Sequence, residues 1–139
     1  GMSSSGTSIT CEVGLQLIVP DRAPVPLVAR LDYSVDDPYA IRAAFHVGDD
    51  EPVEWIFARE LLTVGIIRET GEGDVRIWPS QDGKERMVNI ALSSPFGQAR
   101  FHAQVAPLSE FLHRTYELVP AGQESDYIDI DAEIAEHLS

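Results

Sequence analysis

Residues 9–19, Ile-Thr-Cys-Glu-Val-Gly-Leu-Gln-Leu-Ile-Val, decide the fold class. Every odd position of this stretch is apolar, whereas the even positions up to Gln16 are polar or glycine. Alternation with a period of two residues is typical of a β-strand that buries one face. Cys11 falls on the apolar face, where a thiol behaves as a small hydrophobic side chain. We therefore predict a long strand with Cys11 in the core.

The same alternation recurs along most of the chain, interrupted by turn-forming segments. Residues 27–35 resume it after a turn that contains Pro20 and Pro24, which predicts a hairpin with the first strand. Residues 58–67 are ambiguous, because their first half favours a helix and their second half is rich in β-branched residues that favour a strand. The further alternating stretches are residues 41–47, 53–57, 75–78, 87–92 and 99–105.

The hydrophobic period changes near the C-terminus. Apolar residues from Leu108 to Leu118 fall on one face of a helix, and Pro107 suits the first turn of that helix. The acidic segment after Ser125 carries a second helical stripe, which either docks on its own domain or holds an oligomer together. This stripe consists of Tyr127, Ile130, Ile134 and Leu138.

These patterns predict an α+β fold. We expect a mainly antiparallel, strongly curved β-sheet or open barrel of seven to eight strands with two C-terminal helices. Residues 1–8 are expected to be a disordered start, with Gly1 left by an expression tag. Residues 9–124 should form one domain, and residues 125–139 an acidic amphipathic helix.

Charge limits the classes of partner. The chain has 139 residues with 23 acidic and 10 basic side chains, so its formal net charge is −13, and its nine Arg and one Lys are scattered singly. Phosphate backbones and anionic membranes are bound by clustered cations, so we expect no nucleic-acid binding and only indirect membrane contact. The single cysteine fits a reducing compartment, and a cytoplasmic location is expected.

The sequence carries no recognisable motif for catalysis or for a cofactor. Gly71-Glu72-Gly73 fails as a dinucleotide fingerprint, because Arg76 stands where the third glycine is needed. His46 with the acidic residues 49–51 is interpreted as a solvated turn rather than a metal site. We therefore expect no enzyme activity, no metal and no cofactor.

The two tryptophans receive different interpretations. Trp55 alternates with apolar neighbours and is assigned to the core. Trp78 falls on the polar side of its strand, together with Arg76 and Asp74. An outward tryptophan is a common anchor of protein interfaces, so we predict partner binding by Asp74, Arg76 and Trp78. The alternative is that Trp78 packs over the rim of the sheet.

Several longer motifs point to one family when they are taken together. The sequence resembles the SsgA-like proteins, sporulation-specific cell division proteins of actinobacteria, and within that family it is most similar to the SsgB branch. The resemblance extends from about residue 9 to residue 124. Its most specific segments are Val53-Glu54-Trp55-Ile56-Phe57-Ala58-Arg59-Glu60-Leu61-Leu62, Gly73-Asp74-Val75-Arg76-Ile77-Trp78-Pro79 and Leu92-Ser93-Ser94-Pro95-Phe96-Gly97.

The resemblance implies a non-enzymatic protein that is concentrated at division septa. It implies that the chain recruits the tubulin-like division protein FtsZ to septum sites, promotes FtsZ polymerisation and works with an SsgA-type protein. The resemblance also implies a homo-oligomer, specifically a trimer. In that assembly the chain would be an adaptor that binds FtsZ, not an enzyme that acts on it. The implied architecture is also similar to that of single-stranded nucleic-acid-binding proteins, so a nucleic-acid-binding module is the alternative function.

Overall fold

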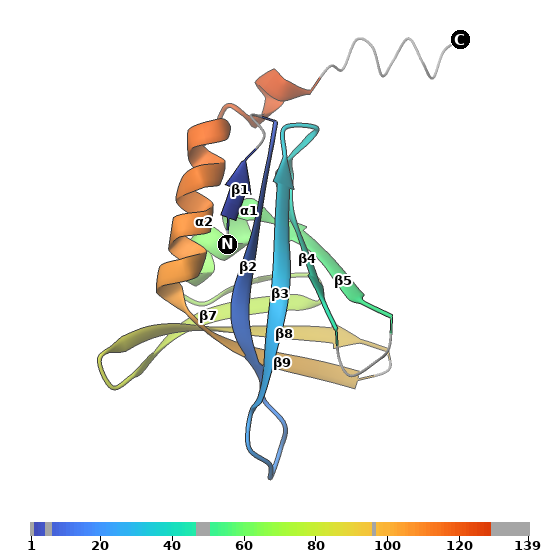
Figure 1. Cartoon of the computed structure of the whole chain (residues 1–139), viewed down its shortest axis with the longest axis vertical. Helices are drawn as coiled ribbons and strands as arrows, with labels where there is room; N and C mark the ends of the chain where they lie inside the picture. The colour runs from blue at the N-terminus through green and yellow to red at the C-terminus, as the bar shows by residue number, and fades with distance from the viewer. Residues whose placement is uncertain (1, 5–6, 47–50, 96, 129–139) are drawn as a thin grey trace.

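The computed structural model describes residues 2–4, 7–46, 51–95 and 97–128. Within these residues, a run of strands is interrupted by one short helix and followed by a longer one (Figure 1). The elements are β1 (Met2–Ser4), β2 (Ser8–Leu17), β3 (Val25–Ser34), β4 (Asp37–Phe45), β5 (Val53–Ala58), α1 (Arg59–Gly65), β6 (Thr70–Glu72), β7 (Val75–Asp82), β8 (Glu85–Ser94), β9 (Gly97–Gln104), α2 (Val105–Leu118) and the 3-10 helix η1 (Glu124–Tyr127).

The strands form a single antiparallel sheet. Its order is β5-β4-β3-β2-β9-β8-β7-β6, and β1 pairs with β2 off this path. The predicted hairpin of β2 and β3 is confirmed, with Cys11 opposite Leu31. Strands β2 to β5 run across the direction of β7 to β9 (Figure 1), so the sheet is strongly curved. The predicted α+β class with a curved antiparallel sheet is therefore confirmed.

A short seam joins the two halves of the sheet. Strand β2 meets β9 at two register pairs, Gln16 with His102 and Leu17 with Phe101. Just beyond them, the backbone N–H of Ile18 donates to the carbonyl oxygen of Arg100 over 2.9 Å. The closure of the curved sheet thus depends on a contact between segments more than 80 residues apart in sequence.

Both α-helices cover the inner face of the curved sheet. Helix α2 buries Leu108 and Phe111 against inward side chains of β2 and β8, which explains its amphipathic pattern. Helix α1 packs against β7 so closely that a Cβ atom at Gly65 would overlap the side chain of Ile77. Neither helix has the length and apolar character needed to cross a membrane, among the residues described.

The structure resolves the ambiguity of residues 58–67 in favour of a helix. Helix α1 places Leu61, Leu62 and Ile66 in the core, while Ile67 is 70% exposed. Burial of positions separated by one, four and five residues requires a helical turn, so packing overrides the strand propensity of the β-branched side chains.

At both ends of the chain, the described residues have a different secondary structure from the one expected from the sequence. Met2–Ser4, expected to be part of a disordered start, pair with β2 as strand β1. Ser125 lies in η1, a 3-10 helix rather than the first turn of an α-helix, and Ile128 has extended backbone with φ −106° and ψ 121°. The hydrogen bonding of η1 ends at Ile128, so no α-helix begins at Ser125. The rest of the predicted helix, from residue 129, lies outside the described residues.

Candidate partner-binding surface

Strand β7 presents the three predicted interface residues at one side of the sheet. Val75 and Ile77 point inward to the core, so Arg76 and Trp78 point to the outer face. Asp74 directly precedes the strand, and its carbonyl oxygen accepts a 2.9 Å hydrogen bond from the backbone of Ser93. The structure therefore brings these three residues together at the start of β7, where backbone hydrogen bonds join this segment to β8.

Trp78 is half-buried on this outer face. The guanidinium of Arg100 lies 5.6 Å from the centre of its ring, a cation–π arrangement. Beneath it, the amide nitrogen of Asn89 donates to the Trp78 carbonyl oxygen over 3.3 Å and to Ser80 Oγ over 2.9 Å. Trp78 is thus partly exposed. Arg100 contacts its ring, and Asn89 binds its backbone carbonyl oxygen.

Two arginines flank this tryptophan. Arg76 is exposed and forms an ion pair with Glu69, which is also exposed. Arg76 and Arg100 lie on either side of Ala91, their common cross-strand neighbour. The positive charge of Arg76 is offset by Glu69, and Asp74 lies beside the same strand, so the tryptophan lies among charges of both signs. We call the surface made by Asp74, Arg76, Trp78, Ala91 and Arg100 the outer patch.

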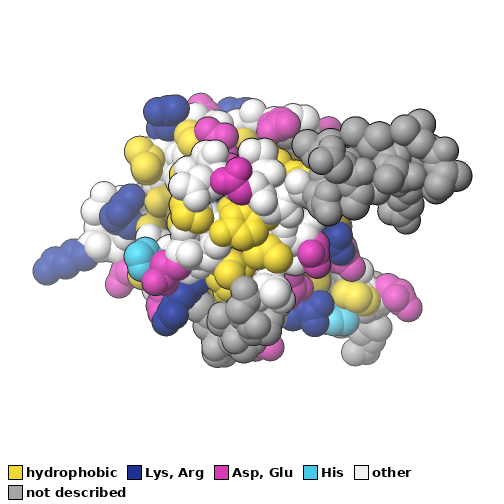
Figure 2. Space-filling model, turned by 90° about the horizontal axis from the view of Figure 1, so that it is seen from above, with side chains coloured by type: hydrophobic (Ala, Val, Ile, Leu, Met, Phe, Trp, Pro, Cys, Tyr) yellow, Lys and Arg dark blue, Asp and Glu magenta, His cyan; other side chains and the backbone are white. Residues whose placement is uncertain are grey.

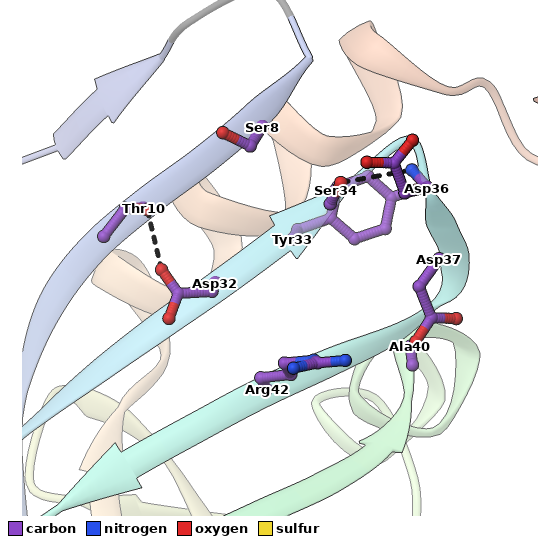
Figure 3. Close-up of a pocket in the computed structure, with 9 residues that line it drawn as sticks. All are labelled: Ser8, Thr10, Asp32, Tyr33, Ser34, Asp36, Asp37, Ala40 and Arg42. Carbon is purple, nitrogen blue, oxygen red and sulfur yellow. Dashed lines mark hydrogen bonds between the residues drawn. The ribbon is translucent and has the colours of Figure 1, made fainter.

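A polar hollow of about 460 Å³ lies across the outer face of β2, β3 and β4 (Figure 3). Asp32 is held there by Thr10 Oγ1 at 2.7 Å and by Arg30 Nε at 3.0 Å. The Thr10–Asp32 bond joins cross-strand neighbours of β2 and β3, and the Arg30–Asp32 bond joins residues two apart on β3, so we interpret both as stabilisation of this face of the sheet. Further along the hollow, the Ser34 hydroxyl accepts a hydrogen bond from the backbone of Asp36.

Arg59 forms a buried network that the sequence analysis missed. Its side chain is 2% exposed, and Nη1 donates to the carbonyl oxygens of Thr115 at 3.0 Å and Val119 at 2.8 Å. Nη2 donates to Glu124 Oε1 at 2.9 Å. The guanidinium lies 4.0 Å from the ring centre of Tyr116. Arg59 thus satisfies carbonyl groups at the end of α2, which is a common use of a cation at a helix C-terminus.

Two titratable side chains of the core are perturbed by burial. Burial raises the pKa of the Cys11 thiol to about 11, so the thiol stays protonated near neutral pH. Burial also raises the pKa of Tyr33 to about 12, partly offset by the neighbouring positive charge of Arg59. The Tyr33 hydroxyl donates to the carbonyl oxygen of Pro38 over 2.8 Å. Both groups therefore act as packing residues, as predicted for Cys11.

The predicted C-terminal stripe is represented by one described residue. Tyr127 lies at the end of η1 and is 42% exposed. Ile130, Ile134 and Leu138 lie outside the described residues. The structure therefore brings together the three residues at the start of β7, whereas the arrangement of the stripe lies outside the described residues.

Comparison with known proteins identifies relatives along nearly the whole chain. A family model described as the Streptomyces sporulation and cell division protein SsgA matches residues 27–124. The sporulation-specific cell division protein SsgB of Frankia casuarinae is 51% identical over 128 residues, which are 92% of this chain and 90% of that protein. SsgB of Streptomyces coelicolor is 46% identical over 133 residues, covering 96% and 97% of the two chains.

Solved structures agree with these sequence matches. An SsgA-like sporulation-specific cell division protein from Thermobifida fusca is 88% identical, with a TM-score of 0.82 and coverage of 98% of this chain and 99% of the other. An SsgB structure from Streptomyces coelicolor is 45% identical, also with a TM-score of 0.82, and covers 90% and 99% of the two chains. On the matched sequence and the shared fold together, the chain belongs to the SsgA family of sporulation and cell division proteins.

Proposed function

We propose that this chain serves sporulation-specific cell division as a non-enzymatic adaptor, which recruits FtsZ to septum sites and promotes its polymerisation. The relatives are named for sporulation-specific cell division, and none of the names specifies a catalytic activity. The structural observation that supports the proposal is the outer patch, where a half-buried tryptophan is flanked by two arginines. Trp and Arg are the side chains most enriched at the energetic centres of protein interfaces.

Oligomerisation gives this adaptor a physical mechanism. A homo-oligomer, in this family expected to be a trimer, presents several identical outer patches at fixed spacing. Several weak contacts to one filament raise the effective local concentration and favour polymer over free subunits. We propose that an SsgA-type protein shares this assembly in the cytoplasm, at division septa, and that any membrane contact passes through a partner.

The experiment is co-sedimentation of FtsZ under polymerising conditions with the purified chain, whose mass is checked by light scattering. We expect more FtsZ in the pellet with the wild-type chain than without it, and less of this increase with Trp78→Ala. A folded, oligomeric wild-type chain that leaves the pelleted FtsZ unchanged would contradict the proposal.

Nucleic-acid binding is the competing function, and the charge distribution weighs against it. Arg59 is buried, and Arg30 and Arg76 are paired with carboxylates. On the end of the molecule shown in Figure 2, Asp and Glu side chains are interspersed with Lys and Arg side chains around a group of hydrophobic side chains. Binding to a phosphate backbone depends on clustered cations and weakens steeply with salt. A salt-dependent mobility shift of labelled single-stranded DNA would favour this competing function.

A further inference from the structure

The inward face of strand β5 is only partly covered. In the order of the described strands β5 lies at one end of the sheet and pairs with β4. Its inward side chains Trp55 and Phe57 are half-buried, and Val53 is 38% exposed. Their neighbours on the same face of β4, Ile41 and Phe45, are by contrast buried. Accessible apolar surface at the margin of a core is typical of a ligand-binding groove.

Two apolar spaces adjoin this face. The outer one is a slot of about 280 Å³ between the start of β5 and the hairpin of β8 and β9. The inner one is a cavity of about 40 Å³, bounded on the helical side by Leu62 of α1 and Leu108 of α2. Four side chains line both spaces, so the slot leads into the cavity. They are Phe45, Trp55, Leu92 and Phe101.

The chemistry of the lining favours an apolar occupant over water. Every described residue that lines the inner cavity is apolar, so a water molecule there would find no polar side chain. Apolar cavities stay dry and take up apolar molecules instead. The described residues around the slot include no charged side chain, and its polar side chains are Ser94 and Gln98. The two spaces therefore suit a molecule with an apolar inner end and a polar outer end.

The dimensions favour a single unbranched chain over a ring. The inner cavity of about 40 Å³ is far smaller than the cavity of about 150 Å³ that admits benzene. Where the two spaces meet, the rings of Phe45 and Phe101 lie edge to face with their centres 4.8 Å apart. A chain of methylene groups is narrower than a ring, so its end can enter a cavity that excludes the ring.

Charge at the mouth of the slot decides the polar end of such a ligand. Val53 lines the slot, and the exposed Glu51 and Glu54 lie on either side of it in the sequence. No described Lys or Arg lines the slot. A carboxylate or phosphate would therefore be repelled, whereas an uncharged hydroxyl can form a hydrogen bond with the amide of Gln98.

We propose that the slot and the inner cavity form a binding site for a single-chain amphiphile with an uncharged head, such as a long-chain alcohol, taken up from solution. The end of the alkyl chain lies in the inner cavity beside α1 and α2, and the hydroxyl lies near Ser94 and Gln98. This binding does not require FtsZ, so it can be measured without any division partner.

Isothermal titration calorimetry of the full-length chain with 1-octanol tests the site. We expect saturable binding that is about fifteenfold tighter for 1-octanol than for 1-hexanol, because each of the two further methylene groups contributes about fourfold when buried. The ring alcohol cyclooctanol should bind about tenfold more weakly than 1-octanol, because a ring does not enter the inner cavity. The anion octanoate should bind about tenfold more weakly because of the carboxylates beside the slot.

Two filling variants and one control locate the site. Ala99→Leu adds carbon atoms to the slot, and Ala43→Val adds them to the inner cavity. Ala44→Leu is the matched control, because Ala44 lies on the outer face of β4, opposite Arg30. Circular dichroism shows which variants fold. We expect each folded filling variant to bind 1-octanol about tenfold more weakly than the wild type, and Ala44→Leu to bind it equally well.

Four results would overturn the proposal. Absence of saturable heat up to the solubility limit of 1-octanol would show that the two spaces are not a site. Unchanged affinity in folded Ala99→Leu or Ala43→Val would place the alcohol elsewhere on the chain. Octanoate or cyclooctanol that binds as tightly as 1-octanol would contradict the ligand class. Flotation of the chain with phosphatidylcholine vesicles that is lost in Ala99→Leu would show that the site takes acyl chains from a bilayer, not single-chain molecules from solution.

Discussion

The guanidinium of Arg59 and the carboxylate of Glu124 lie 2.9 Å apart and connect the start of α1 to the 3-10 helix η1. The arginine is almost fully buried and also bonds two carbonyl groups at the C-terminal end of α2. One side chain therefore links the start of α1 to the end of α2 and to η1, with partners that lie 56 to 65 residues further along the chain.

We expect Arg59→Met to destabilise the protein by about 3 kcal/mol, because it leaves the Val119 carbonyl oxygen and the Glu124 carboxylate without this donor. Urea unfolding followed by circular dichroism measures the change. Arg76→Met is the control, since the ion pair of Arg76 is exposed and should contribute less than about 0.5 kcal/mol. Equal effects of the two substitutions would show that the buried network adds little.

The stability should also depend on pH through Glu124. A hydrogen bond from its own backbone N–H and the Arg59 guanidinium hold the pKa of Glu124 below its ordinary value, although desolvation opposes them. A lowered pKa in the folded state stabilises the fold fully above the ordinary value of about 4.3, and this contribution is lost as the pH falls through the folded pKa. Urea unfolding from pH 7 to pH 3 should show wild type and Glu124→Gln converging in acid. A constant difference across this range would contradict the assignment.

Trp78→Ala should reduce binding to the division partner, because it removes the aromatic ring of the outer patch. It should change stability modestly, because the Trp78 side chain is only half-buried. Trp55→Ala is the matched control: Trp55 packs against the core and should cost about 3 kcal/mol. Co-sedimentation reports binding, and thermal unfolding reports stability. A larger loss of melting temperature for Trp78→Ala than for Trp55→Ala would assign Trp78 to the core instead.

Gly65→Ala should destabilise the fold even though alanine is the better helix former. A Cβ atom at position 65 would overlap Ile77, and overpacking of this kind costs about 2 kcal/mol. Gly14→Ala is the control, because nothing lies within 4 Å of the added carbon and β2 is exposed there. Chemical unfolding of both variants gives the comparison, and a stabilised Gly65→Ala would show that α1 can move away from β7.

Local patterns predicted those parts of the fold that depend on neighbours in sequence. The alternation from Ile9 to Leu17 and from Leu27 to Tyr33 was sufficient for the hairpin of β2 and β3, because the turn between them is short. The helical face from Leu108 to Leu118 was sufficient for α2. In both cases one buried face determines the side-chain period.

Long-range contacts could not be predicted in this way. Nothing in residues 16–18 specifies pairing with β9, because that contact depends on how the whole sheet curves. Arg59 stands in an apolar stretch, which was a signal of a buried cation, but its partner Glu124 follows 65 residues later at no fixed spacing. The pairing of Arg100 with Trp78 likewise requires the neighbouring order of β7, β8 and β9.

The seam between β2 and β9 has a mechanical consequence. Within the described residues, the two halves of the sheet are joined by two paired positions of β2 and β9 and one further backbone hydrogen bond. Strands β2 and β3, by comparison, are paired at ten positions. Helix α2 contacts both β2 and β8, and so connects the two halves of the sheet on their inner face. A rotation of one half of the sheet relative to the other must therefore displace the apolar face of α2. The stiffness with which the molecule holds Trp78 relative to β5 therefore depends on the side-chain packing of that helix as well as on the few backbone bonds between β2 and β9.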